Sequence, residues 1–202
     1  MNLEETYDRI AGDWHRDHHS DTWWQEGTNE FISRLPAGGR VLDAGCGSGV
    51  KSAYLLEHGF FLTGIDISNN MLGIARREAP GGDYRHLSLT DLDQLTESFD
   101  GVFAQASLLH IPKADVGEVI RKMAERAKPC GLVYLAVKEA RASELEEEVK
   151  KESDLGYEYE RFFSYFTMKE LEQYLAQAGL NVVWQERTLS GKTVWLQIIA
   201  QK

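Results

Sequence analysis

Cysteine and basic residues are scarce in this sequence of 202 residues, and each scarcity excludes a class of protein. The two cysteines, Cys46 and Cys130, do not suggest a disulfide framework or a metal-ligating cluster, and they favour a reducing, cytoplasmic setting. Lysine and arginine number 22 against 32 aspartates and glutamates, so the formal net charge is −10. Binders of nucleic acid usually present a basic face, so neither nucleic acid nor an anionic membrane is an expected partner.

Long hydrophobic runs and repeats are also missing. No uninterrupted apolar stretch approaches the roughly 20 residues that cross a membrane, and residues 1–10 are acidic and polar, unlike an export signal. With 43% apolar residues, the chain is expected to fold as one domain over residues 1–202.

What the sequence does contain is a glycine-rich turn, Asp43-Ala44-Gly45-Cys46-Gly47-Ser48-Gly49, directly after an apolar run. Alternating glycines permit positive φ values and the close approach of a ligand to the backbone. A helix expected from Val50 would point its unpaired N–H groups at that ligand. A second strand ends in Asp66, roughly 20 residues further on, where a carboxylate accepts hydrogen bonds from both ribose hydroxyls. The pattern predicts a nucleotide-like cofactor.

Strand and helix patterns alternate along much of the chain. Strands are expected at 40–44, 60–66, 83–87, 101–106 and 132–137, with helices at 50–58 and 69–78 and another that has Pro112 in its first turn. This alternation predicts right-handed βαβ units and a parallel sheet. A capping box, Thr167 with Glu170, starts a helix that ends at Gly179, and residues 181–200 are expected to form a terminal hairpin.

Two segments depart from this alternation. Residues 2–19 have a helical pattern and precede Trp23 and Trp24, so residues 1–27 are expected to form a lid. The other segment, about 141–166, is an expected insertion after the fifth strand. Its charged part, 141–154, places glutamates four residues before lysines and predicts a solvated helix, whereas the aromatic run 157–166 is expected to line a pocket.

Asp66 alone would suit either NAD or an adenosyl cofactor. Dinucleotide enzymes favour G-x-G-x-x-G, whereas this chain has D-x-G-x-G-x-G. A pyrophosphate also usually needs a second mononucleotide-binding half, for which a chain ending in a hairpin leaves little room. A NAD-linked oxidoreductase on a related fold remains an alternative, as does a non-catalytic cofactor-binding module.

The segments VLDAGCGSG, GIDIS, SFDGVF, SLLHIP and KPCG together resemble class I S-adenosylmethionine-dependent methyltransferases of the small-molecule type. The resemblance runs from about Tyr7 to the C-terminus. It implies an α/β fold, a Rossmann-like seven-stranded and mostly parallel sheet with helices on both faces and an antiparallel last strand. It also implies S-adenosyl-L-methionine as cofactor, S-adenosyl-L-homocysteine as product, and a small-molecule methyl acceptor. The acceptor, its accepting atom and the oligomeric state, monomer or dimer, are left open.

Carried over by position, the resemblance implies a set of cofactor contacts. Gly45, Cys46 and Gly47 would border the methionine part, with Asp43 orienting the loop. Asp66 would hold the ribose. The other implied contacts are Ile67 and Met71 near the adenine, Asp91 on its amino group with Leu92 beside the ring, Gln105 facing the methionine part, and Tyr7 in the lid.

Residues for the second substrate are harder to identify. His110, just beyond the fourth strand, is the candidate general base, which a hydroxyl acceptor usually needs and a thiolate or neutral amine does not. No metal is predicted, because nothing completes a ligand set around the nearby His15, His18 and His19. The candidate substrate contacts, which favour an apolar or aromatic molecule, are Trp14, Trp23, Trp24, Tyr159, Arg161, Phe162 and Tyr165.

Overall fold

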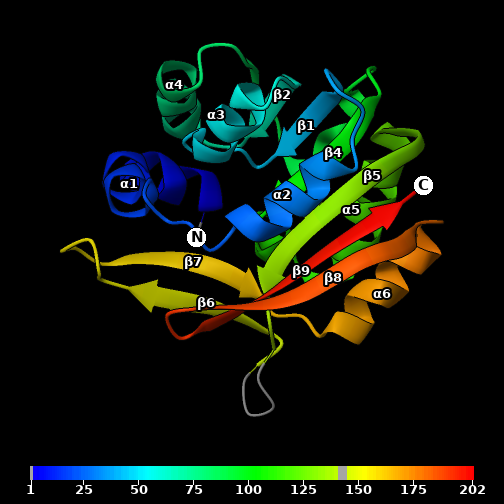
Figure 1. Ribbon diagram of the computed structural model, residues 1–202. Helices are drawn as coiled ribbons and strands as arrows, with labels where there is room; N and C mark the ends of the chain where they lie inside the picture. Colours follow the sequence, from blue (N-terminus) through cyan, green and yellow to red (C-terminus); the bar gives the residue numbers. More distant parts are fainter. Residues whose placement is uncertain (1, 141–144) are drawn as a thin grey trace.

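A seven-stranded sheet forms the centre of the computed structural model, which describes residues 2–140 and 145–202 (Figure 1). The strand order is β3-β2-β1-β4-β5-β9-β8. The strands are β1 (Arg40–Ala44), β2 (Phe61–Asp66), β3 (Asp83–His86), β4 (Phe99–Gln105), β5 (Ala127–Lys138), β8 (Asn181–Ser190) and β9 (Thr193–Gln201). β1 to β5 run parallel, and β9 runs antiparallel to both of its neighbours. The predicted fold class is confirmed.

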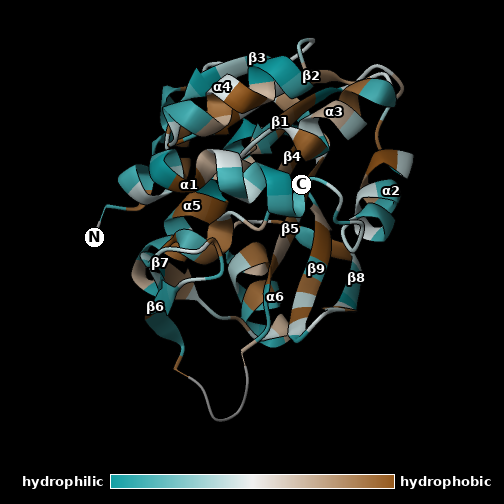
Figure 2. Cartoon of the chain, turned by 90° about the vertical axis from the view of Figure 1, so that its left-hand side faces the viewer, coloured by the Kyte–Doolittle hydropathy of each residue, from teal (hydrophilic) through white to brown (hydrophobic). Residues whose placement is uncertain are grey.

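Helices cover both faces of the sheet. They are α1 (Leu3–His18), α2 (Gln25–Ser33), α3 (Val50–Glu57), α4 (Asn69–Glu78), α5 (Lys113–Arg126) and α6 (Met168–Gln177), with two short 3-10 helices, η1 (Leu89–Gln94) and η2 (Leu108–His110). One apolar core lies under α5 and α6, and a second lies under α2, α3 and α4. Figure 2 shows apolar residues concentrated on the sheet, β9 among them. None of the described helices is long and apolar enough to cross a membrane.

The charged part of the insertion is a strand, so the prediction of a solvated helix was wrong. β6 (Glu147–Glu152) pairs antiparallel with β7 (Tyr159–Ser164), and the hairpin lies below α1 in Figure 1. Its charges meet across the two strands, as in the pairs Glu152–Arg161 and Lys151–Glu160. Such cross-strand pairs stabilise a hairpin as i,i+4 pairs stabilise a helix, so the spacing of charges alone did not decide between them. Residues 141–144 of this segment lie outside the described residues.

Helix α1 forms where the sequence predicted it, and it joins the sheet to the insertion. On one side, the Asp8 carboxylate accepts hydrogen bonds from the hydroxyl of Ser68 at 2.6 Å and the backbone N–H of Asn70 at 2.9 Å, at the start of α4. On the other side, the hydroxyl of Tyr157 donates to Asp13 at 2.8 Å. The helix therefore spans the carboxyl edge of the sheet.

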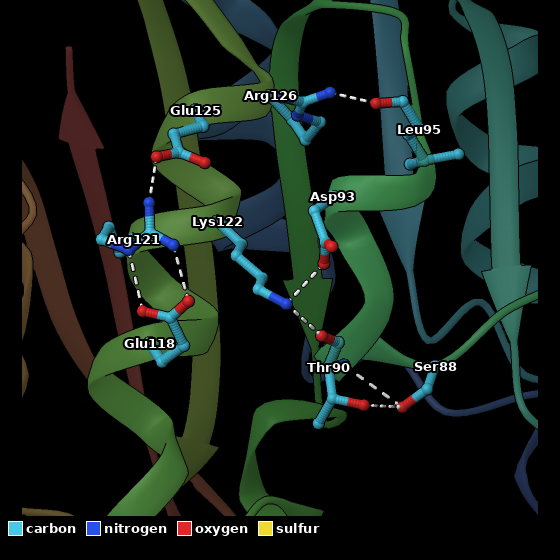
Figure 3. Close-up of polar contacts among 9 residues, drawn as sticks. All are labelled: Ser88, Thr90, Asp93, Leu95, Glu118, Arg121, Lys122, Glu125 and Arg126. Atoms are coloured by element: carbon cyan, nitrogen blue, oxygen red, sulfur yellow. Dashed lines mark hydrogen bonds and ion pairs between the residues drawn. The ribbon is translucent and has the colours of Figure 1, made fainter.

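Polar contacts fix η1 against α5 (Figure 3). The ammonium of Lys122 donates to the backbone carbonyl of Thr90 at 2.6 Å and also pairs with Asp93. The guanidinium of Arg126 donates to the carbonyl of Leu95, just beyond η1. These bonds hold η1 against α5.

Candidate functional site

A cavity of about 590 Å³ opens at the carboxyl ends of the parallel strands. Residues of α1, the glycine turn, β2, β4, β5, β7 and β9 line its wall. Ligands of open α/β sheets bind at this edge, where the loops after the strands diverge. The cavity is therefore the candidate functional site.

The three glycines of the turn differ in how closely the protein packs against them. All have positive φ, +84° at Gly45, +52° at Gly47 and +85° at Gly49. A Cβ at Gly45 would lie 2.3 Å from the Cβ of Ser107, and one at Gly49 would lie 2.7 Å from the Cα of Ala75 in α4. A Cβ at Gly47 would meet nothing within 4 Å. Two glycines serve packing, and Gly47 leaves open space beside the backbone for a ligand.

This difference predicts unequal stabilities for two alanine variants. Both Gly47→Ala and Gly49→Ala carry the strain of a left-handed backbone, roughly 1–2 kcal/mol. Gly49→Ala also forces α3 and α4 apart, and such overpacking typically costs about 1–3 kcal/mol more. Denaturant titration should therefore show Gly49→Ala to be the less stable variant. Equal free energies of unfolding would contradict this account of the turn.

Two carboxylates, the buried Asp43 and the half-buried Asp66, order the loops around the cavity. Asp66 accepts the backbone N–H of Gly47 and that of Ser68, each at 2.9 Å, and so ties the glycine turn to the start of α4. Burial raises the pKa of Asp66, and the two N–H bonds oppose that rise. Asp43 accepts the hydroxyl of Ser52 at 2.7 Å, and burial raises its pKa to about 6. Each oxygen of Asp66 keeps acceptor capacity for a ligand on the cavity wall.

A hydrogen-bonded pair from α1 and η2 stands across the cavity from the glycine turn. Nδ1 of His110 lies 2.7 Å from the carbonyl oxygen of Phe162, which only accepts, so this nitrogen carries the proton. Nε2 is then the acceptor for the hydroxyl of Tyr7, also at 2.7 Å. Burial lowers the pKa of His110 to about 3, so the ring is neutral at pH 7. These two hydrogen bonds hold His110 in one defined tautomer and fix Tyr7 beside it.

Arg161 of β7 links the insertion to this pair. Its Nε and Nη2 donate to the two oxygens of Glu152 at 2.6 and 2.8 Å, and its Nη1 lies 3.3 Å from the hydroxyl of Tyr7. The guanidinium also lies 4.3 Å from the ring centroid of Trp14 in α1. Glu152 neutralises the charge of Arg161. The contacts with Tyr7 and Trp14 make Arg161 a link between α1 and the β6–β7 hairpin.

Gln105 carries an unsatisfied amide at the end of β4. The residue is 6% exposed, and neither amide atom has a hydrogen-bond partner among the described residues. The hydroxyl of Tyr134, which lies nearby, donates instead to Gln197 at 2.5 Å. An unpaired buried amide costs roughly 1–3 kcal/mol, so a polar ligand in the cavity is expected to complete it.

Most residues that the sequence predicted for the site lie on the cavity wall. They are Tyr7, Trp14, Trp23, Asp43, Gly45, Cys46, Gly47, Asp66, Ile67, Met71, Gln105, His110 and Arg161. Asp91 and Leu92 do not line it. Ser88 and Leu89 lie there instead, because η1 turns Leu92 into the core under α5. This stretch therefore contributes a serine and a leucine to the wall.

Four predicted substrate contacts also lie away from the wall. Trp24 is buried edge-on against Tyr54, the hydroxyl of Tyr159 donates to Asp154 at 2.5 Å, and Tyr165 packs in the core with its hydroxyl on Glu148 at 2.6 Å. Phe162 does not line the cavity and contributes only its carbonyl oxygen. Alternate residues of a strand face opposite sides, so β7 turns Arg161 and Phe163 into the cavity and Phe162 out of it.

Several wall residues were not predicted, namely Lys51, Ser88, Leu89, Lys138, Glu152 and Trp195. Their only sequence signal is position, since Lys138 directly follows the expected strand 132–137 and Trp195 belongs to the expected hairpin. The three histidines near the lid are used locally. His15 bonds Ser48 at 3.0 Å and His18 stacks on Trp14. Across residues 2–140 and 145–202, no group of histidine, cysteine and carboxylate side chains is arranged to hold a metal.

Comparison with known proteins gives this site a context. A family model described as "Methyltransferase domain" matches residues 16–185. The ubiquinone biosynthesis O-methyltransferase of Dechloromonas aromatica is 38% identical over 105 residues, which are 50% of this chain and 44% of that protein. Its counterpart in Xanthomonas axonopodis pv. citri is 38% identical over 114 residues, 53% and 47% of the two chains. The match spans less than half the length of these curated relatives.

Two solved structures extend the likeness to nearly the whole chain. The Burkholderia thailandensis 1,6-didemethyltoxoflavin-N1-methyltransferase, with 1,6-didemethyltoxoflavin and S-adenosylhomocysteine bound, has a TM-score of 0.78 at 21% identity and covers 99% of this chain and 87% of its own. The magnesium protoporphyrin IX methyltransferase of Synechocystis, with S-adenosylmethionine bound, has a TM-score of 0.75 at 19% identity and covers 99% and 95%. At these identities the likeness shows a shared fold.

Proposed function

This chain belongs to the family of methyltransferase domains, and on that premise we propose that it transfers a methyl group from S-adenosylmethionine to a small molecule. The family resemblance predicted from the sequence is thereby confirmed. The observation that carries the proposal is the wall of the cavity, where an open glycine backbone at Gly47, the carboxylate of Asp66 and the unpaired amide of Gln105 face the same space. The seven-stranded sheet ends in the antiparallel strands β9 and β8 and provides no second nucleotide-binding half, which counts against a NAD enzyme.

The cofactor-binding residues follow from this geometry. Asp66 would accept the ribose hydroxyls, and the apolar side chains of Ile67, Met71 and Leu89 would enclose the adenine. Ser88 would take the polar contact expected of Asp91.

The methionine part would lie over Gly45 and Gly47 and satisfy the amide of Gln105. Its carboxylate needs a cation, and Lys51 offers one in the first turn of α3, beside the unpaired N–H groups at the start of that helix. Burial lowers the pKa of Lys51, a penalty that a bound carboxylate would relieve.

When bound, the cofactor supplies a methyl group on a cationic sulfur, which leaves as a neutral thioether. The protein's task is to hold the acceptor in line, and orientation of this kind lowers a barrier by as much as roughly 7–11 kcal/mol. The neutral His110, with its pKa lowered to about 3, is a weak base. We therefore assign it a positioning role, in which it accepts the hydroxyl of Tyr7 and fixes the lid residue beside the reacting groups.

Titration calorimetry with S-adenosylmethionine and S-adenosylhomocysteine tests the binding half of the proposal. The catalytic half needs a panel of thiols, amines, phenols and carboxylates, with S-adenosylhomocysteine production as the readout. Both ligands should bind, and at least one class of acceptor should be methylated. Binding without turnover over the whole panel would favour a non-catalytic module.

The positioning role of His110 makes a distinct prediction. His110→Gln and Tyr7→Phe should lower kcat about tenfold or less, whereas loss of a true general base typically costs 10²–10⁴-fold. The wild-type rate should also show no inflection near pH 6.5, because the ring stays neutral down to about pH 3. The measurement is kcat and KM against pH with an acceptor from the panel. An inflection near pH 6.5 that His110→Gln abolishes would restore the base role.

Two broader expectations accompany this function. The helix α1, together with residues up to 27, would act as the lid of a single methyltransferase domain, with the β6–β7 hairpin as its insertion. A cytoplasmic location remains a prediction from the free cysteines, of which Cys46 is buried and Cys130 exposed.

A further inference from the structure

We infer that the methyl acceptor is a planar, aromatic-type molecule carrying an oxyanion, a carboxylate or a phosphate, and that Lys138 binds this group beside Phe163 and Trp195. The inference rests on the proposed function and specifies the substrate class of the same cavity. It assigns an anchoring group and leaves the methyl-accepting atom open.

The first argument is the position of Lys138 in the sheet. It is the last residue of β5 and the direct cross-strand partner of Trp195 in β9, so their side chains lie on the same face. Gln105 of β4 pairs with Ala136, two residues earlier in β5, and each residue advances a strand by roughly 3.3 Å. Lys138 therefore lies beyond the cofactor end of the cavity, toward the insertion.

The second argument is the unmatched charge of Lys138. Its half-buried ammonium makes no ion pair or hydrogen bond to any residue that the structure describes. It lies 3.8 Å from the ring centroid of Phe163 and 6.0 Å from that of Trp195. The neighbouring cations differ, because Arg161 is paired with both oxygens of Glu152 and Lys150 lies 3.9 Å from the same carboxylate.

A bound anion would offset the free-energy cost of burying the Lys138 ammonium without a counterion. Taking a cation out of water without a counterion is unfavourable. Burial, together with the nearby charges of Arg161 and Lys150, lowers the pKa of Lys138 to about 8, and the charges of Glu152 and Glu148 oppose this shift. The ammonium is still mostly charged at pH 7, and a bound oxyanion would supply the missing partner.

The third argument is the shape of the surrounding wall. The ring of Trp195 stacks on that of Trp23, with centroids 4.1 Å apart, and Phe163 presents a further ring to the same cavity. Flat aromatic walls favour a planar ligand through stacked or edge-to-face contact.

Matched probes test the inference on the full chain saturated with S-adenosylhomocysteine. The probes are 2-naphthoate, 2-naphthyl phosphate and the neutral 2-naphthamide, with indole-3-acetate and indole-3-acetamide as a second pair, and titration calorimetry reports binding. In the wild type, an anionic probe should bind about tenfold or more tightly than its amide, the gain expected of a charge-assisted hydrogen bond. Comparison of the naphthoate with the phosphate identifies which oxyanion the site prefers.

Three variants locate the effect. Lys138→Met should bring the preference below twofold, and Lys138→Arg should preserve it. The matched control Lys151→Met removes a lysine with an 81% exposed side chain from the nearby β6–β7 hairpin and should leave the preference unchanged. The wild-type preference should also fall as pH rises through about 8, since Lys138 then loses its proton.

The possible failures are distinguishable. If calorimetry shows that S-adenosylhomocysteine does not bind, the proposed function fails together with the inference. If it binds but no anionic probe is preferred over its amide, or Lys138→Met keeps the preference, the inference alone is overturned.

Discussion

Replacing Asp66 by alanine is expected to weaken S-adenosylmethionine binding by about 100-fold, because hydrogen bonds to a charged group contribute about 1.5–3 kcal/mol each. Two effects combine in this loss. The ribose hydroxyls lose their acceptor, and the N–H groups of Gly47 and Ser68 lose the carboxylate that ties the glycine turn to α4. Asp66→Asn keeps the shape of the side chain, so its loss of affinity should be smaller. Calorimetric Kd values for S-adenosylmethionine measure both variants.

Asp91→Ala is the matched control for this experiment. The sequence placed Asp91 on the adenine, whereas the structure places it off the cavity wall, in η1. Its removal should change the Kd less than twofold. A loss comparable to that of Asp66→Ala would show that the adenine lies against η1 further along than Leu89. Thermal unfolding of each variant establishes that the fold is retained.

Replacing Arg161 by methionine is expected to lower the free energy of unfolding by about 3–5 kcal/mol, the usual cost of leaving one buried charge without its partner. The side chains of Arg161 and Glu152 are only 6% and 11% exposed, so water cannot solvate the remaining carboxylate. The loss is a large fraction of the roughly 5–15 kcal/mol by which a domain is stable. Urea titration with a common m-value measures it.

A double variant separates the missing partner from the missing contact. Arg161→Met with Glu152→Met removes both charges, and replacement of a buried pair by apolar groups is often neutral or stabilising. The double variant should therefore regain most of the stability lost in Arg161→Met. The control Lys151→Met breaks the exposed pair with Glu160, 3.7 Å apart, and should cost less than about 1 kcal/mol. A double variant no more stable than the single one would show that Arg161 acts through its aromatic contacts.

The parts of the site that depend on backbone geometry were predictable from the sequence. The glycines after β1 and the carboxylate at the end of β2 are required wherever a parallel sheet binds a nucleotide-like ligand at its edge. Their spacing in the sequence therefore predicted that they lie together at the edge of the sheet, and they do line the cavity there. The parallel pairing of β1 to β5 followed from the alternation of strand and helix patterns, and the antiparallel β9 from the terminal hairpin and the resemblance.

The parts of the site that depend on side-chain packing were not predictable from the sequence. The aromatic residues of the insertion divide between cavity, core and hairpin contacts because β7 is a strand, and charge spacing had predicted a helix before it. Asp91 lies off the cavity wall for a local reason, since the wall at η1 is formed by Ser88 and Leu89. Lys138 belongs to no motif, and its importance lies in the absence of a carboxylate partner among residues 2–140 and 145–202, which no sequence pattern shows.

The position of β9 has a consequence for synthesis on the ribosome. This strand follows every other strand of the sheet in the sequence, yet it lies between β5 and β8 and brings Trp195 to the wall of the cavity. Until residues 193–201 emerge, the nascent chain can pair β1 to β5 but leaves the long edge of β5 open, the kind of edge that invites association with other chains. The cavity is therefore completed only once residues 193–201 have been translated.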